Sequence, residues 1–208
     1  MNKSYSWLAF VAAAVCVGPG GASAQTADHQ DHSEHRKMVK ENPARYETTT
    51  ETYTAPDIVL EDHNGNETPL ASLLESPEPV ALNFIFTTCT TICPVMTATF
   101  AHMLSELGPQ ADGLRMVSIS IDPEYDSPGV LKQYAERYKA RPDWRFLTGD
   151  AKQIVAVLKA FDAYTGSKGS HRPITLMKGP GSDHWLRIDG LASGADLSTE
   201  YRRLLGES

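Results

Sequence analysis

Two cysteines, Cys89 and Cys93, lie four residues apart in the stretch 84-FIFTTCTTICPVMTATF-100. Thiols at this spacing fall on one face if the intervening residues wind helically. Such a pair can form a structural disulfide, a redox couple or a two-thiolate metal chelate. A purely structural disulfide would close too small a loop to constrain the unfolded chain much, so the spacing favours the other two.

The position of the pair in the chain favours thiolate chemistry. The run PVALNFIF, residues 79–86, predicts a strand buried on both faces. Residues 94–108 have apolar positions at helical spacing, with Gly108 as the stop. The cysteines therefore lie where a strand gives way to the positive end of a helix dipole, which stabilises thiolates. Pro94 is compatible with this first turn, because its missing N–H has no intrahelical acceptor there.

A soft metal ion needs a further ligand, and two thiolates with one imidazole suit copper. His102 lies too far along the predicted helix to reach back, and His63 and His184 lie beside predicted turns. His171 stands in GSKGSHRPIT, a loop that leads into a strand and can abut the start of the first helix. A lone loop histidine is more often an exposed bystander than a ligand, so the residues alone leave its role open.

The first 24 residues have the pattern of a cleavable secretory leader. One lysine precedes an apolar stretch of about 11 residues from Trp7 to Val17, and Ala22-Ser23-Ala24 predicts cleavage after Ala24. The stretch is shorter than the roughly 20 residues of a spanning helix. We expect a periplasmic protein that is membrane-associated only if the leader is retained. Cleavage after Ala24 removes Cys16 with the leader. The alternative, that Cys16 is the modified cysteine of a lipoprotein, is disfavoured because the Ala-Ala-Val before it fits a lipobox poorly.

Residues 25–44 form a polar tail that composition predicts to be disordered. Its histidines His29, His32 and His35 are consistent with simple solvation or with weak recruitment of copper or zinc. Residues 45–208 suffice for one domain with a full core. The net charge of −7 becomes −8 when Lys3 leaves with the leader, and nothing in its distribution suggests a nucleic-acid partner.

The remaining patterns predict an alternation of strands and helices. Residues 46–54 are β-prone, and 57–70 predict a hairpin around Asn64-Gly65. The later expected elements are a buried strand at 114–121, helices at 127–140 and 149–164 around a short strand at 144–147, a hairpin at 174–190 turning at Gly179–Ser182, and a helix at 197–205. This order predicts an α/β domain with a central mixed sheet flanked by helices and an N-terminal β-hairpin extension.

The run FIFTTCTTICPVM, followed by VSISIDPEYDSPGVLKQYAERY and then by a histidine ahead of the last hairpin, resembles the Sco/SenC family of copper chaperones. The resemblance covers roughly residues 57–205. It implies a thioredoxin-like fold and a copper site made by Cys89, Cys93 and His171. It also implies a metallochaperone that delivers copper to the binuclear centre of a terminal, cytochrome c type oxidase. We expect the chain to act as a monomer. The implied partners are the copper-site subunit of the oxidase, a copper donor chaperone and a thiol reductant.

The competing function is that of a thiol:disulfide oxidoreductase, in which Cys89 attacks and Cys93 resolves. Its substrates would be cysteine pairs of the oxidase copper site or of other exported proteins. Such a redox couple needs only the two thiols, so His171 and the absence of a two-residue CxxC spacing favour copper. A peroxidase or copper sensor is a weaker alternative.

The sequence departs from the family pattern in two places. Ser170 stands before the histidine where the family usually has an aspartate, and the leader is predicted to be cleaved where many members keep a membrane helix. Asp122 matches an acidic position of the family. We interpret Asp122 and Asp126 as turn formers rather than metal ligands.

Overall fold

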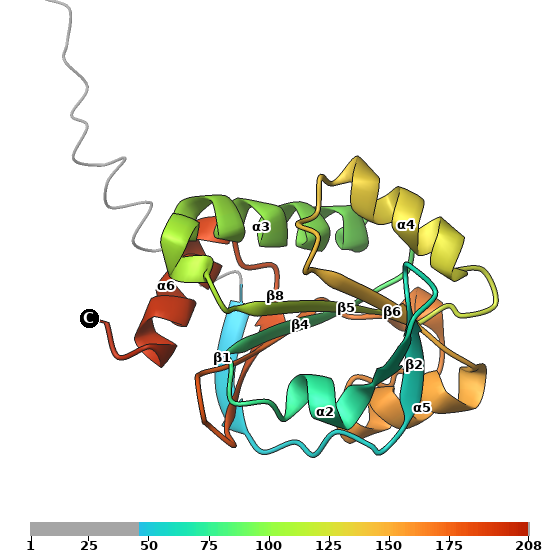
Figure 1. The fold of residues 1–208 in the computed structure, drawn as a ribbon, viewed down its shortest axis with the longest axis horizontal. Coiled ribbons are helices and arrows are strands. Elements are labelled where there is room, and N and C mark those ends of the chain that lie inside the picture. The colour runs from blue at the N-terminus through green and yellow to red at the C-terminus, as the bar shows by residue number, and fades with distance from the viewer. Residues whose placement is uncertain (1–45, 208) are drawn as a thin grey trace, which may run out of the picture. The chain divides into compact units, whose positions relative to one another are not determined.

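An eight-stranded mixed sheet runs through the domain in the computed structural model, which describes residues 46–207 (Figure 1). The predicted leader with Cys16, and the predicted tail with its three histidines, lie outside the described residues. The strand order is β1-β8-β7-β4-β5-β6-β2-β3. The strands are β1 (Tyr46–Glu51), β2 (Val59–Asp62), β3 (Glu67–Pro69), β4 (Val80–Ile85), β5 (Arg115–Ser120), β6 (Arg145–Thr148), β7 (Ile174–Lys178) and β8 (Trp185–Gly190).

Strand β4 lies at the centre, and every one of its residues is buried. It pairs in parallel with β5 and antiparallel with β7. This placement agrees with its sequence, which is apolar except at Asn83 and is typical of a strand covered on both faces. The hairpin β2–β3 turns at Asn64-Gly65, as predicted, and it extends the sheet by pairing with β6. Strand β1 closes the other edge by pairing with β8.

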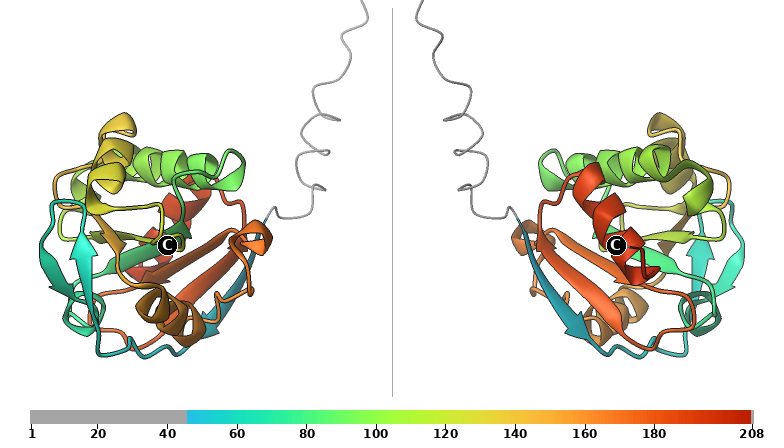
Figure 2. Two further views of the ribbon diagram at one scale, coloured as in Figure 1. Left: turned by 90° about the vertical axis from the view of Figure 1, so that its right-hand side faces the viewer. Right: turned by 90° about the vertical axis from the view of Figure 1, so that its left-hand side faces the viewer.

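Helices cover both faces of the sheet (Figures 1 and 2). Three of them, α3 (Ile92–Leu107), α4 (Pro128–Arg137) and α6 (Gly194–Leu204), share a core with one set of strand side chains. The helices α2 (Leu70–Leu74) and α5 (Ala151–Ala160) share a core with the other set. Because side chains alternate along a strand, β4 sends Ala81 to the first core and Leu82 to the second.

The predicted order of elements is confirmed, with differences at the helix ends. Helix α3 begins at Ile92 rather than residue 94, so it includes the second cysteine. Helix α6 begins at Gly194 rather than residue 197, because Ser193 and Asp196 form a capping box there. The short helix α2 was not expected. None of the helices in residues 46–207 combines the length and apolar character that crossing a bilayer requires.

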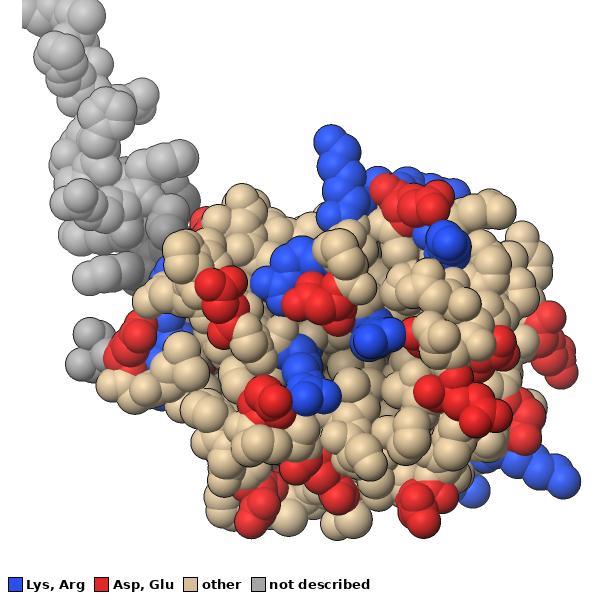
Figure 3. Space-filling model, in the orientation of Figure 1, with Lys and Arg blue, Asp and Glu red and all other residues tan. Residues whose placement is uncertain are grey.

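Charged side chains of both signs are interspersed over the face shown in Figure 3. That face therefore lacks the single-sign field that would steer a polyanion or polycation to it.

Candidate metal centre

The chain leaves β4 at Ile85 and enters α3 at Ile92, and the two thiols lie on either side of that entry. Cys89 belongs to the connection and Cys93 to the first turn of α3, and both are buried free thiols. The backbone N–H of Cys93 donates to Cys89 Sγ at 3.4 Å. Thr91, at the N-cap position, makes no side-chain capping bond. Cys89 Sγ therefore accepts one of the free N–H groups at the start of α3, the place usually taken by an N-cap oxygen.

The two thiols differ in acidity. Burial opposes ionisation of Cys89, but hydrogen bonds from the Cys93 and Thr91 backbone outweigh it and lower the pKa of the thiol to about 7. Burial raises the pKa of the Cys93 thiol to about 12, and the nearby Cys89 and Asp126 add to this effect. Cys89 is therefore the more acidic thiol, ionised in about half of the molecules at pH 7, and Cys93 is its protonated neighbour.

His171 follows a 3₁₀ turn, Lys168–Ser170, and its side chain is buried against β4. Its Nε2 lies 3.0 Å from the carbonyl oxygen of Phe84. A carbonyl can only accept, so Nε2 carries the proton and Nδ1 holds the lone pair of the neutral ring. Burial lowers the pKa of His171, partly opposed by the bond to Phe84. The ring also meets Phe86 edge to face, with centroids 6.4 Å apart. The side chain of His171 thus packs against β4 and the first residue of the connection that follows it, whereas we expected the loop to abut the start of α3.

The structure brings the predicted donors together only in part. The two thiols adjoin each other, whereas the imidazole of His171 contacts the Phe84 carbonyl of β4, the strand that leads to them. Within residues 46–207 there is no cluster of three or more His, Cys, Asp or Glu side chains ready to hold a metal ion. The donor types nevertheless fit a soft ion. The bond from Nε2 to the Phe84 carbonyl is the kind that a ligating imidazole makes through its second nitrogen.

The other histidines of the domain are engaged elsewhere. His102 lies 3.7 Å from Glu106 on α3. His63 accepts the backbone N–H of Phe146 through Nδ1, and His184 contacts Thr52.

Asp126 is a residue of this site whose role the sequence did not reveal. It is fully buried and accepts the Thr87 backbone N–H at 3.1 Å and the Ser120 hydroxyl at 2.6 Å, as well as the Thr87 hydroxyl. Its carboxylate therefore ties the β5–α4 connection to the start of the cysteine segment. Asp126 also takes part in the predicted turn, since its N–H bonds the Asp122 carbonyl. No local pattern could indicate the longer contact, because Thr87 lies 39 positions away.

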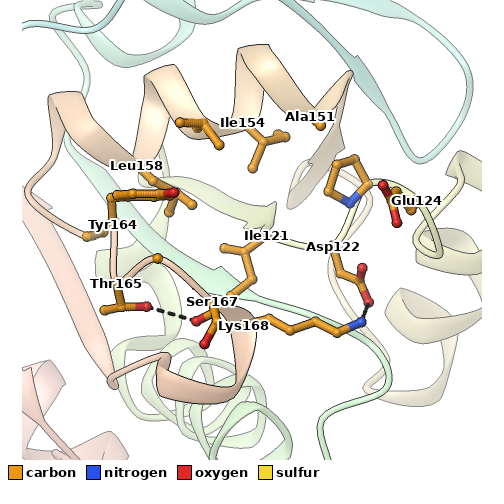
Figure 4. Close-up of a pocket in the computed structure, with 14 residues that line it drawn as sticks. Ile121, Asp122, Glu124, Ala151, Ile154, Leu158, Tyr164, Thr165, Ser167 and Lys168 are labelled. Carbon is orange, nitrogen blue, oxygen red and sulfur yellow. Dashed lines mark hydrogen bonds and ion pairs between the residues drawn. The ribbon is translucent and has the colours of Figure 1, made fainter.

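An ion pair anchors the turn that carries His171. Lys168 Nζ lies 2.5 Å from Asp122 Oδ2 and 5.9 Å from the centre of the Phe86 ring. Figure 4 shows this pair at one side of a cavity of about 390 Å³, with α5 along the opposite wall. The carboxylate of Asp122 thus binds an ammonium group and holds the His171 turn against the end of β5.

A mixed sheet between two helical layers, with a cysteine pair at the start of the helix after the central strand, defines a thioredoxin-like protein with a vicinal thiol site. The SCO1/SenC family model matches residues 46–180. The chain belongs to this family, which confirms the resemblance noted in the sequence. The match begins earlier than predicted, at Tyr46, and ends before β8 and α6.

Individual relatives agree with this assignment. The chain is 36% identical to the SCO1 protein homolog of Bacillus subtilis over 114 residues, which cover 53% of this chain and 58% of that protein. It is 29% identical to Protein SenC of Rhodobacter capsulatus over 100 residues, 48% of this chain and 44% of that protein. The chain thus spans about half the length of the curated relatives it matches.

Solved structures confirm the fold. BsSco, a member of the Sco family of cytochrome c oxidase assembly proteins described for its disulfide switch, superposes with a TM-score of 0.63 at 28% identity. That match covers 77% of this chain and 98% of BsSco. Copper-bound yeast Sco1 gives a TM-score of 0.63 at 21% identity over 76% of this chain and 96% of that one, a likeness of fold alone.

Proposed function

We propose that this chain is a periplasmic copper metallochaperone that delivers copper to the binuclear centre of a terminal, cytochrome c type oxidase during its assembly. The observation that carries the proposal is the pair of adjoining free thiols at the start of α3, with the imidazole of His171 seated on the strand that leads to them. Membership of the SCO1/SenC family and the copper-bound forms of yeast Sco1 and Bradyrhizobium japonicum ScoI support it.

The sulfurs of Cys89 and Cys93 and the Nδ1 of His171 would hold the copper cargo. Thiolates suit Cu(I), and an imidazole donor adds affinity for Cu(II). Cys89 supplies a thiolate near neutral pH, whereas Cys93 must lose its proton, so copper uptake releases protons. The bond from Nε2 to the Phe84 carbonyl orients the imidazole during this exchange.

Export rests on the leader in residues 1–24, and the partners follow from the delivery role. They are the copper-site subunit of the oxidase, a copper donor chaperone and a reductant that keeps the two cysteines as thiols. We infer that the chain acts as a monomer.

Anaerobic copper titration of the reduced protein tests the site directly. We expect about one strongly bound copper per chain, as a set of two thiolates and one imidazole would hold. Oxidation of Cys89 with Cys93 should abolish this binding, because a sulfur in a disulfide cannot also ligate as a thiolate. Unchanged binding after oxidation would overturn the assignment.

The variant His171→Ala tests the third donor, with His184→Ala as the matched control because His184 is exposed and contacts Thr52. His171→Ala should lose the thiolate-to-Cu(II) charge-transfer absorption and keep much of its Cu(I) binding, since Cu(I) accepts two thiolates. It should also fail to restore oxidase activity in a strain that lacks the protein. His184→Ala should behave as wild type in all three assays.

A second candidate function is that of a thiol:disulfide oxidoreductase acting on cysteine pairs of exported proteins or of the oxidase copper site. The unequal acidity of the two thiols favours it, because an attacking thiolate and a protonated resolving thiol make a redox pair. Such a couple does not need the imidazole. Full restoration of oxidase activity by His171→Ala, with none by Cys89→Ser, would select this function over copper delivery.

A further inference from the structure

A cavity of about 630 Å³ lies at the end of the sheet opposite to the cysteine pair. Lys178, the last residue of β7, lines it and pairs with Val80 at the first residue of β4. The cysteines follow the last residue of β4, so that strand, about 17 Å long, separates the two places. The walls come from the segment after β1, the end of α2 and the β7–β8 turn: Thr52–Ala55, Leu74–Pro77, Gly181–Asp183 and Trp185.

The ammonium group of Lys178 is buried in this wall, with 5% of the residue exposed. Its Nζ donates to the carbonyl oxygen of Leu74 at 2.7 Å and lies 5.4 Å from the centre of the Trp185 ring. An ammonium carries three N–H donors. Among the described residues the other two have no protein acceptor, so they are available to a molecule in the cavity.

Lys178 also lacks a counter-charge. Residues 46–207 contain one other buried cation, Arg187, which contacts Asp189 at 2.6 Å. No carboxylate in that range lies within ion-pair distance of Lys178. Burial lowers the pKa of Lys178, while the more distant Glu75 and Asp183 oppose this shift.

A purely structural role for Lys178 accounts for only part of this arrangement. The bond to Leu74 caps the last carbonyl of α2, which uses a single donor and needs no cavity. A buried cation without a partner is unfavourable, and an anionic group in contact with it would supply the missing charge.

We propose that this cavity binds a small zwitterion of the amino-acid type, with its carboxylate on Lys178 Nζ. Glu75 and Asp183 are exposed and line the cavity, so two negative charges accompany the one positive charge. They repel a simple anion and attract a molecule that also carries a positive group. Ser76 and Ser182 also line the cavity, with their hydroxyl groups already donating to the carbonyl oxygens of Leu73 and His184. This inference does not depend on the copper-delivery function.

The test uses matched probes added to the full-length protein. Glycine and L-leucine are the zwitterions, 4-methylpentanoate is leucine without its ammonium group, and L-leucinamide is leucine without its carboxylate. The readout is the indole N–H resonance of Trp185, with that of Trp144 as an internal reference because Trp144 is buried in the opposite core. We expect saturable shifts of Trp185 alone with a zwitterion.

Loss of the leucine carboxylate and loss of the leucine ammonium group should lower the affinity by different amounts. Leucinamide should bind about ten- to a hundredfold more weakly than leucine, because it loses hydrogen bonds to a charged donor. 4-Methylpentanoate should bind about two- to fivefold more weakly, because the rim carboxylates are solvent-screened. No saturable shift with either glycine or leucine would overturn the proposal.

Two sets of variants complete the test. Lys178→Met keeps the aliphatic stem and should abolish leucine binding, and retained wild-type affinity would refute the role of Lys178. Because this change also removes the cap of α2, the exposed pair Glu75→Gln with Asp183→Asn provides a second measure. It should weaken leucine binding and strengthen 4-methylpentanoate binding. Unchanged affinity for both probes would show that a zwitterion is the wrong class of ligand.

Discussion

Alkylation of the two cysteines with iodoacetamide should be strongly unequal. With a pKa of about 7, roughly half of Cys89 is thiolate at pH 7. With a pKa of about 12, only about one Cys93 side chain in 10⁵ is ionised at that pH. The thiolate fractions therefore differ by a factor of about 5 × 10⁴.

Nucleophilicity partly offsets this difference. A thiolate gains reactivity with basicity, with a Brønsted slope of about 0.4–0.5. Over five pKa units this favours Cys93 by about 100- to 300-fold, which leaves Cys89 faster by roughly 150- to 500-fold. Complete burial of the Cys93 side chain slows it further. We expect the Cys89 rate to rise with pH around a midpoint near 7, against about 8.5 for an unperturbed thiol.

Peptide mass spectrometry after timed alkylation between pH 5 and 10 measures both rates in one sample. Cys93→Ser is the control, because it keeps the backbone N–H that donates to Cys89 Sγ and should leave the Cys89 midpoint low. Equal rates for the two cysteines, or a Cys89 midpoint near 8.5, would refute the reasoning. Either result would mean that the N–H groups at the start of α3 do not stabilise the Cys89 thiolate.

Three further predictions concern the scaffold. Asp126→Asn should lower the free energy of unfolding by about 2–4 kcal/mol, measured by denaturant titration, because the amide presents donors to buried donor groups. Gly194→Ala should lower the free energy of unfolding by about 1–3 kcal/mol in the same assay, because an added Cβ would lie 2.8 Å from the Cβ of His102. The control Gly129→Ala has open space around it and should leave the free energy of unfolding unchanged or raise it slightly. Acidification from pH 7.5 to 5.5 should lower the melting temperature. Burial lowers the pKa of His63 and His171, so the unfolded chain binds protons that the folded chain does not. The free energy of unfolding therefore falls as the pH drops below the unfolded-state histidine pKa of about 6.5. The double variant His63→Gln with His171→Gln should flatten that profile, and an unchanged slope would contradict this explanation.

The fold was largely predictable because its information is local. The apolar run of β4, the Asn64-Gly65 turn and the helical spacing of α3 each require only a few neighbouring residues. Two features were not local. Helix α2 has five residues, too few to show a periodicity. Strand β1 is polar and largely exposed, so its pairing with β8 depends on contacts between distant parts of the chain.

In the candidate site, too, local sequence reveals some features and does not reveal the contacts between distant residues. Spacing alone identified the two cysteines as a pair, and the family resemblance selected His171. The contacts of Asp126 with Thr87 and of Lys168 with Asp122 join residues 39 and 46 positions apart, and no periodicity records them. These contacts fix where the cysteine segment and the His171 turn lie, so the sequence indicated the donors without indicating what positions them.

The position of His171 is explained by where the hydrogen-bonded pairing of β7 with β4 ends. Strand β7 pairs with β4 only as far as Thr175 opposite Asn83, so the next carbonyl of β4, that of Phe84, has no partner in that ladder. The Nε2 of His171 takes this place at 3.0 Å. A buried carbonyl without a donor is unfavourable, so the imidazole stabilises the sheet whether or not a metal is bound. Because that bond uses only Nε2, the lone pair on Nδ1 stays available, and a structural role for His171 is compatible with a metal-binding one.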